Sequence, residues 1–185
     1  MKLLEKTLKA GLVVVLAMTL GSAASFAQKK KAKCKDGETD QVAKYELSKG
    51  DNLDNAINAS LTGAAGDATK GLKWMTHRRL GNCIACHEVS NIAKLAKPED
   101  LSSQKKYGFH GAVGPTLDGV AERYTEGELR LIVVDIKKAL PEADSIMPSF
   151  HRADAFNRVH KDCVGQVVLS AERVEDVVAY LKTLK

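Results

Sequence analysis

The chain has 185 residues, of which 44% are hydrophobic and 28% are charged, with a formal net charge of +5. This length suits one domain with tails. Part of the positive charge lies in the first residues and in the run Lys29-Lys30-Lys31. The sequence has no basic stripe interleaved with aromatic residues, the pattern that would indicate a nucleic-acid-binding protein.

Residues 1–27 have the three parts of a Sec-type secretory signal. Several lysines precede an apolar stretch over 11–20, and small residues precede Gln28, the expected mature N-terminus. The apolar stretch is shorter than the ~20 residues of a membrane span. We therefore expect export to the periplasm by a cleaved signal and no membrane span afterwards, with an uncleaved anchor as the alternative.

Residues 28–66 are polar, rich in lysine at their start and without a clear periodic pattern. They predict an extended N-terminal arm with little regular structure that lies over the domain or over a partner. Composition alone would equally fit a flexible tail.

The domain itself is expected over residues 67–185. Asp67 can cap a helix that runs to about Arg79, with Leu72 and Met75 facing inward. Gly71 lowers the helix propensity of this segment. A glycine at that position would allow a second helix to approach closely.

The next segment, Cys83-Ile84-Ala85-Cys86-His87, has the C-x-x-C-H pattern that attaches a c-type haem. Two thiols add to the two haem vinyl groups, and the adjacent His87 can bind the iron as proximal ligand. A C-x-x-C pair without the histidine would also fit a redox dithiol or half of a zinc site. We therefore predict one covalent haem c held by Cys83 and Cys86.

A long connection over 88–113, with a short helix expected around 90–96, leads to Gly114-Pro115-Thr116-Leu117. In a c-type domain the Pro115 carbonyl would accept the hydrogen bond from His87 Nδ1, and this bond would orient the imidazole. Leu117 would pack at the haem edge. Without the haem motif, an ordinary Gly-Pro turn would be the better interpretation.

Thr125 and Glu128 form a T-x-x-E capping box that starts a core helix, which Pro141 stops after Leu140. Ser170 can cap a last helix over 171–184 with a continuous apolar stripe. We expect this last helix to cross the helix that contains Gly71.

Met147 lies in a loop before Pro148 and is the predicted distal iron ligand, because a thioether suits haem iron and raises its potential. The alternative is a core methionine with a histidine as ligand. The competing histidines are His77, His110, His151 and His160, and His151 is the nearest to Met147 in sequence.

Cys34 in the arm and Cys163 near the C-terminus belong to no haem motif. An exported protein meets an oxidising environment, so a Cys34–Cys163 disulfide is a natural hypothesis. Free or intermolecular thiols are the alternative.

The order helix, C-x-x-C-H, Gly-Pro-x-Leu, helix, Met-Pro loop, helix resembles class I cytochromes c. In finer detail the amino-acid sequence over residues 55–185 resembles the SoxX family, the monohaem cytochrome c subunit of the thiosulfate-oxidising SoxAX complex. The more particular stretches are Leu129-Arg130-x-Ile132-Val133-Val134-Asp135 and Val174-Glu175-Asp176-Val177-Val178-Ala179-Tyr180-Leu181.

The resemblance implies an all-α, class I cytochrome c-like fold around one haem. It implies a SoxA-like cytochrome partner (dihaem or monohaem) on which thiosulfate is joined to a cysteine of the carrier SoxYZ. In that family the SoxX haem passes the electrons to a small soluble cytochrome c, so no residue of this chain need touch thiosulfate. An independent soluble electron shuttle is the alternative, and a haem sensor or peroxidase is a third class that requires a labile sixth ligand.

Overall fold

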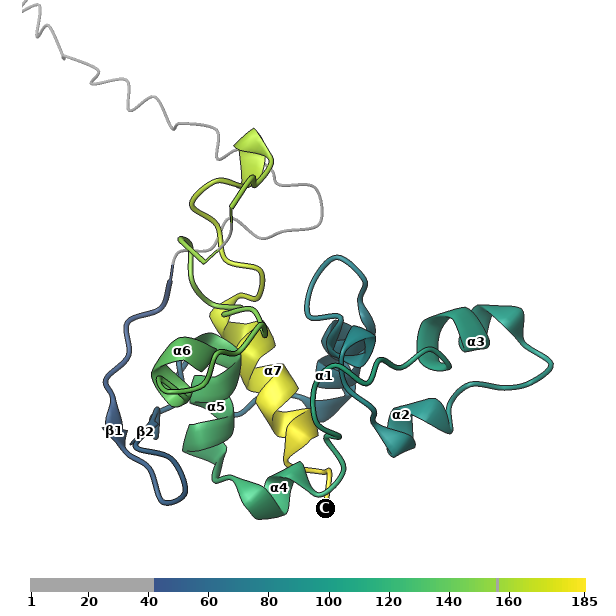
Figure 1. Cartoon of the computed structure of the whole chain (residues 1–185), viewed down its shortest axis with the longest axis horizontal. Helices are drawn as coiled ribbons and strands as arrows, with labels where there is room; N and C mark the ends of the chain where they lie inside the picture. The colour runs from purple at the N-terminus through teal and green to yellow at the C-terminus, as the bar shows by residue number, and fades with distance from the viewer. Residues whose placement is uncertain (1–41, 156) are drawn as a thin grey trace, which may run out of the picture. The chain divides into compact units, whose positions relative to one another are not determined.

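The computed structural model describes residues 42–155 and 157–185 (Figure 1). The helices are α1 (Ala68–Thr76), α2 (Ser90–Ala93), α3 (Leu101–Tyr107), α4 (Val120–Arg123), α5 (Glu126–Val134), α6 (Ile136–Ala139) and α7 (Ala171–Leu181). Two 3-10 turns, η1 (Cys83–Ala85) and η2 (Lys161–Cys163), and a pair of two-residue strands, β1 (Ser48–Lys49) and β2 (Asn55–Ala56), complete the elements. The predicted all-α class is confirmed.

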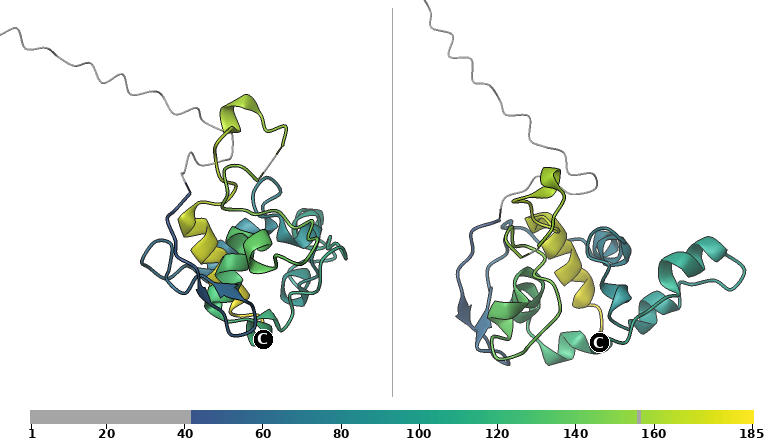
Figure 2. Two further views of the ribbon diagram at one scale, coloured as in Figure 1. Left: turned by 60° about the vertical axis from the view of Figure 1, so that its left-hand side comes forward. Right: turned by 45° about the horizontal axis from the view of Figure 1, so that its top comes forward.

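Helices α1 and α7 cross at Gly71, as the sequence predicts (Figures 1 and 2). The Asp67 side chain accepts hydrogen bonds from the backbone N–H groups of Thr69 and Lys70 and so caps α1. A Cβ atom at Gly71 would lie only 2.1 Å from the carbonyl oxygen of Asp176 on α7. The missing side chain therefore allows the two backbones to approach closely.

The helix predicted from the capping box to Leu140 is interrupted, which corrects the sequence prediction. The capping box of Thr125 and Glu128 is present, but α5 ends at Val134 and α6 starts only after Asp135. Asp135 has φ −152° and ψ 89°, outside the helical region. The following segment stabilises the break, because Phe150 N and His151 N donate to the freed carbonyls of Val133 and Val134.

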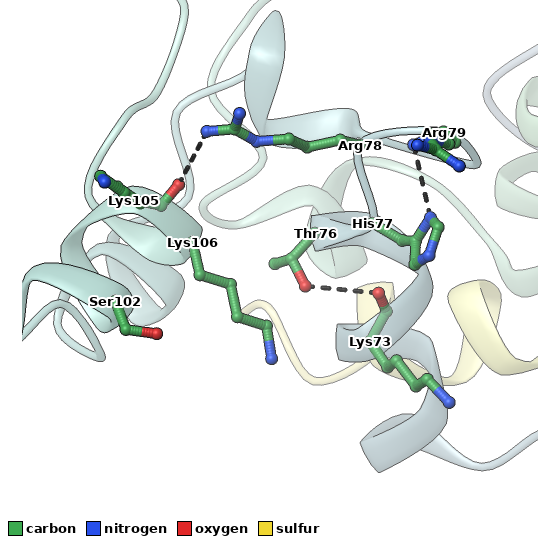
Figure 3. A pocket seen from close by; sticks show the side chains of 8 residues that line it. All are labelled: Lys73, Thr76, His77, Arg78, Arg79, Ser102, Lys105 and Lys106. Carbon is green, nitrogen blue, oxygen red and sulfur yellow. Dashed lines mark hydrogen bonds between the residues drawn. The ribbon is translucent and has the colours of Figure 1, made fainter.

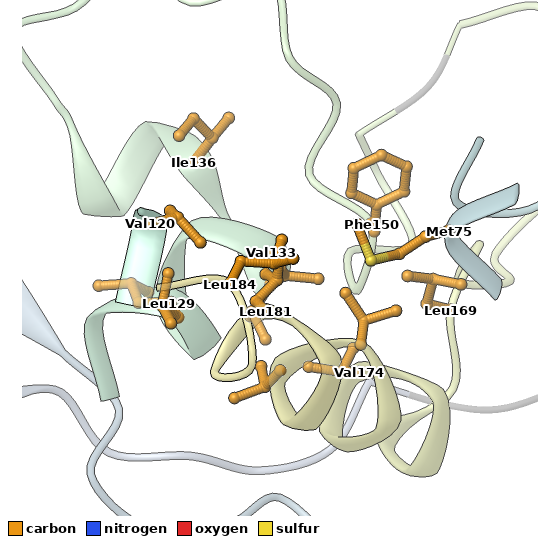
Figure 4. Close-up of a cluster of buried hydrophobic side chains, with 14 of the residues drawn as sticks. Met75, Val120, Leu129, Val133, Ile136, Phe150, Leu169, Val174, Leu181 and Leu184 are labelled. Carbon is orange, nitrogen blue, oxygen red and sulfur yellow. The ribbon is translucent and has the colours of Figure 1, made fainter. Parts of the chain in front are cut away.

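The hydrophobic core lies between α1, α5 and α7 and the segment that follows Met147 (Figure 4). Met75, Leu131, Leu169 and Val174 have no exposed area. The apolar stripe predicted on the last helix is buried, and Leu184 just beyond its end is buried as well. Figure 4 shows Met75 of α1 beside Phe150 and Leu169.

The described part of the predicted arm, residues 42–66, lies on the domain. β1 and β2 pair antiparallel, with Ser48 opposite Ala56. Ala56 and Ile57 are each 1% exposed, and Ile57 N donates to Gly127 O at 3.0 Å. Residues 1–41, which include the predicted signal and Cys34, lie outside the described residues.

The connection over 88–113 contains the expected short helix α2 and a second helix, α3, that the sequence did not predict. None of the α3 residues is buried. In Figure 1 and in the right-hand view of Figure 2, α3 lies away from the α1–α7 pair. No helix within 42–155 or 157–185 combines the length and the apolar character that a membrane span needs.

Candidate cofactor site

The C-x-x-C-H motif forms one tight turn, η1, directly after α1. Cys86 N and His87 N both donate to Cys83 O, at 3.1 and 3.0 Å. Asn82 enters the turn with φ 44°, in the left-handed region that asparagine tolerates better than most residues. Both cysteine side chains are half-buried and unbridged. One turn of chain thus presents two thiols and an imidazole together.

His87 is held by the loop that returns past the motif. Its Nδ1 lies 2.6 Å from the carbonyl oxygen of Pro115, so the contact predicted between these two residues is present. The loop is fixed to the motif by Gly111 N, which donates to Ile84 O, and by Gly114 N, which donates to Cys86 O. An Nδ1–H donor leaves Nε2 as the free ring nitrogen, and Nε2 has no hydrogen-bond partner among the described residues.

Gly114 is a functional position that the sequence prediction missed. A Cβ atom there would lie 2.3 Å from Cε1 and 2.6 Å from Nδ1 of His87. No side chain fits in this space without moving the imidazole ring. The only signal for this role in the sequence was the position of the glycine directly before Pro115. A Gly-Pro pair is also typical of an ordinary turn.

Two of the four competing histidines use both ring nitrogens within the protein. His151 is fully buried, with Nε2 accepting from Ala43 N at 2.8 Å and Nδ1 facing Leu169 O at 2.7 Å. His110 accepts from Val89 N through Nδ1 and faces Tyr107 O through Nε2. His77 is half-buried and accepts from Arg79 N, and His160 is exposed. His151, the nearest competitor of Met147 in sequence, is therefore already engaged.

Met147 lies in the loop after α6, half-buried and packed against the core cluster. Its backbone N donates to Ser145 Oγ at 3.2 Å. The neighbouring Ile146 is 79% exposed, and the following Ser149 and Phe150 are buried. The loop therefore leaves the surface between the exposed Pro148 and the buried Ser149, two residues after Met147.

The sequence comparison decides the family. The family model for cytochrome c matches residues 68–185. A solved structure described as SoxXA from P. pantotrophus matches with 33% identity and a TM-score of 0.59, over 79% of this chain and 98% of that one. The chain belongs to the cytochrome c family and is a monohaem cytochrome of the SoxX type.

Two further comparisons add nothing to that assignment. Ferric cytochrome c-550 from Paracoccus versutus matches with 23% identity and a TM-score of 0.32, over 64% of this chain and 98% of that one, which is too low to carry an argument. A search of curated protein sequences finds no match. The cytochrome c family carries out electron transfer, and a SoxX-type member has one covalently bound haem c.

The residues around the motif suit a haem. A porphyrin is large, planar and mostly apolar, and it needs apolar side chains on the surface that it covers. Phe109 and Val113 on the return loop are 73% and 64% exposed, and Ile146 beside Met147 is also exposed. Leu117, predicted at the haem edge, is half-buried against the core cluster. Two thiols, a free imidazole nitrogen and these apolar side chains match the chemistry of haem c.

Burial raises the pKa of the Cys83 thiol to about 12. The thiol of Cys83 is therefore neutral at physiological pH. No group of three or more His, Cys, Asp or Glu residues that could hold a separate metal ion occurs among the described residues.

A basic cavity of about 510 Å³ lies between the end of α1 and α3, just before the haem motif (Figure 3). It is lined by Lys73, Thr76, His77, Arg78, Arg79, Ser102, Lys105 and Lys106. Arg78 Nη2 donates to Lys105 O at 3.2 Å and so connects the two sides. A second cavity of about 430 Å³ shares Arg78, Lys105 and Lys106 and extends to Ile84 and Ala85 of the motif. Among the described residues the lining of both cavities includes several cations and no acidic side chain, so an anionic reactant would be attracted here.

Proposed function

We propose that this cytochrome is the electron-transfer subunit of a periplasmic L-cysteine S-thiosulfotransferase of the SoxAX type. The observation that carries the proposal is the 33% identity over 98% of a chain of the SoxXA structure. A SoxA-like subunit would be its partner and would hold the bond-forming site. There thiosulfate is joined oxidatively to the SoxYZ carrier cysteine, and a small soluble cytochrome c takes the released electrons.

In this proposal Cys83 and Cys86 would hold the haem through thioethers, and His87 and Met147 would bind its iron as proximal and distal ligands. The haem supplies an iron that gains and loses one electron at a time. Pro115 fixes the His87 ring from the side opposite Nε2, because its carbonyl accepts the bond from Nδ1 at 2.6 Å. The engagement of His110 and His151 elsewhere supports Met147 as the distal ligand.

If both His87 and Met147 bind the iron, no coordination position would remain for a substrate. The chain's own residues would therefore orient the haem and exclude solvent from it, and none would bind thiosulfate. In this proposal the chain transfers electrons, and bond formation takes place on the partner subunit.

The ligand assignment is tested by Met147→Ala in the holoprotein. We expect loss of the near-infrared absorption band that Met–iron ligation gives in oxidised cytochromes c. An unchanged spectrum would overturn Met147 and reopen His77 and His160 as ligands.

The complex is tested by purifying the chain from its native periplasm without a tag on the partner. We expect a second haem-containing subunit to accompany it through size exclusion. A lone monomer would reject the subunit role and favour an independent soluble electron shuttle.

The proposal also includes the cleaved signal over 1–27 and the disulfide between Cys34 and Cys163. N-terminal sequencing of the mature protein should begin at Gln28. A thiol titration of the native holoprotein should find no free thiol before reduction and two after it, because Cys83 and Cys86 are consumed by the haem. Two free thiols without reductant would refute the bridge.

A further inference from the structure

The interruption at Asp135 places a buried carboxylate beside the loop that carries Met147. Asp135 has no exposed area, although it is the residue between two helices. Its side chain does not cap α6, since it makes no hydrogen bond to the backbone of the first turn. The carboxylate is therefore available for contacts outside its own helix.

Those contacts go to the residues that follow Met147. Ser149 Oγ donates to Asp135 Oδ1 at 2.9 Å, and Ser149 is itself only 5% exposed. Arg152 Nη1 lies 3.4 Å from Asp135 Oδ2 and is the one cation near it among the described residues. A fully buried carboxylate needs such partners, because an unpaired charge in the interior is costly.

A second contact fixes the residues that precede Met147. Lys137 Nζ of α6 donates to Ser145 O, and Met147 N donates to Ser145 Oγ. Met147 thus lies midway between two residues, Ser145 and Ser149, that are both bound from the start of α6. Beyond Ser149, Phe150 N and His151 N donate to Val133 O and Val134 O.

We propose that Asp135, acting through Ser149, is a positioning residue that keeps the Met147 thioether on the haem iron. This inference rests on the proposed role of Met147 as distal ligand. Releasing the thioether requires the loop to move away from α6, and the hydrogen bond from Ser149 opposes that movement. Asp135 would therefore set how readily an external ligand replaces the methionine.

The test is an imidazole titration of the oxidised holoprotein. Loss of the near-infrared Met–iron band measures how much imidazole has bound. In Asp135→Ala and Ser149→Ala we expect imidazole to bind roughly 10-fold more tightly than in the parent, which corresponds to about 1.4 kcal/mol. Ser149→Thr keeps the hydroxyl, so its imidazole affinity should stay within about 3-fold of the parent affinity, or roughly 0.6 kcal/mol.

Glu175→Gln is the matched control, because Glu175 is also a buried, ion-paired carboxylate but contacts Arg130 and the arm. It should leave the imidazole affinity unchanged even if it lowers the melting temperature. Unchanged affinity in both alanine variants would overturn the inference, as would an equal change in Glu175→Gln. If Asp135→Ala does not fold, Ser149→Ala decides alone. A parent protein without the Met–iron band would instead reject the ligand assignment itself.

Discussion

Glu128 is a fully buried carboxylate that receives four hydrogen bonds, from Asn52 N, Asn52 Nδ2, Leu53 N and Thr125 N. Burial by itself raises the pKa of this group, but the donated hydrogen bonds outweigh burial and lower the pKa to about 2 from its usual 4.5. The ionised form is therefore the one that the fold requires.

The sign of the resulting pH dependence follows from the lowered pKa. The stabilisation by Glu128 is complete above pH 4.5 and is lost as the pH falls towards 2. Glu128→Gln should lower the free energy of unfolding at pH 7 by about 1–3 kcal/mol, since an amide cannot accept all four bonds. Denaturant titrations at pH 7 and pH 3 should show a smaller difference in the variant than in the parent. An equal pH dependence in the two proteins would contradict this role.

Because Gly114 has no side chain, the His87 ring can occupy the space beside it. Gly114→Ala should displace the ring and weaken the bond from Nδ1 to Pro115 O. A weaker bond makes the imidazole a poorer electron donor, so the reduction potential should rise, by up to roughly 40 mV if about 1 kcal/mol is lost. Gly108→Ala is the control for redox titration, because a Cβ atom at Gly108 would lie nearest to Gln104 and Ala96 and not to His87. A potential that stays at the parent value, or falls, would contradict the argument.

At the scale of elements, α1 and α7 are joined by polar contacts as well as by packing. Asp176 of α7 accepts from Asp67 N at 2.7 Å and from Trp74 Nε1 at 2.9 Å. These bonds fix α1 along its length against α7 and place the haem motif at its end. The position of Cys83 therefore depends on how closely the two helices approach.

Gly71→Ala tests that approach. In an exposed helix interior this change would stabilise by about 1 kcal/mol. Here the added Cβ would meet Asp176 O at 2.1 Å and Tyr180 Cβ at 2.8 Å, so we expect destabilisation by about 1–3 kcal/mol in thermal or denaturant unfolding. A more stable variant would show that the helices can separate without loss.

The helix starts could be predicted because their signals are local. Asp67, Thr125 and Ser170 each cap the helix that immediately follows. The interruption at Asp135 could not be predicted, because the apolar pattern continues through this residue. The partners that stabilise Asp135, Ser149 and Arg152, lie 14 and 17 residues further along the chain.

Two other elements escaped prediction for related reasons. Helix α3 buries none of its residues, so no apolar periodicity marks it. The hairpin of β1 and β2 is held by Glu128, which is more than 70 residues away in sequence from Asn52 and Leu53. The contact between His87 and Pro115 could be predicted, because it depends on a fixed spacing within one loop system.

At the scale of the molecule, basic charge gathers beside the haem motif. Lys105→Glu with Lys106→Glu should slow oxidation of the reduced protein by hexacyanoferrate(III), an anion, by roughly 3–10-fold at low ionic strength. The hydrogen bond from the Arg78 side chain to the backbone carbonyl of Lys105 would remain. The control is Lys44→Glu with Lys49→Glu, the same change in net charge on exposed positions of the arm. Stopped-flow rates should converge at high salt. Equal slowing in both pairs would rule out a local effect of the cavity.

The arm is attached to the domain through buried ions. Arg130 is 2% exposed and donates to both carboxylate oxygens of Glu175, and its Nη1 donates to Ile57 O at 2.7 Å. Glu175 in turn accepts from Leu61 N at 2.8 Å. The segment that precedes α1 therefore belongs to the folded domain as much as α7 does.

This arrangement also governs when the protein can fold. Leu61 and Asp67 leave the ribosome early, yet their partners Glu175 and Asp176 are 114 and 109 residues further along the chain. Contacts of such long sequence separation form late, because a large loop must close first. We therefore expect that the nascent polypeptide cannot close its core until α7 has been synthesised, and that it stays accessible to proteases until then.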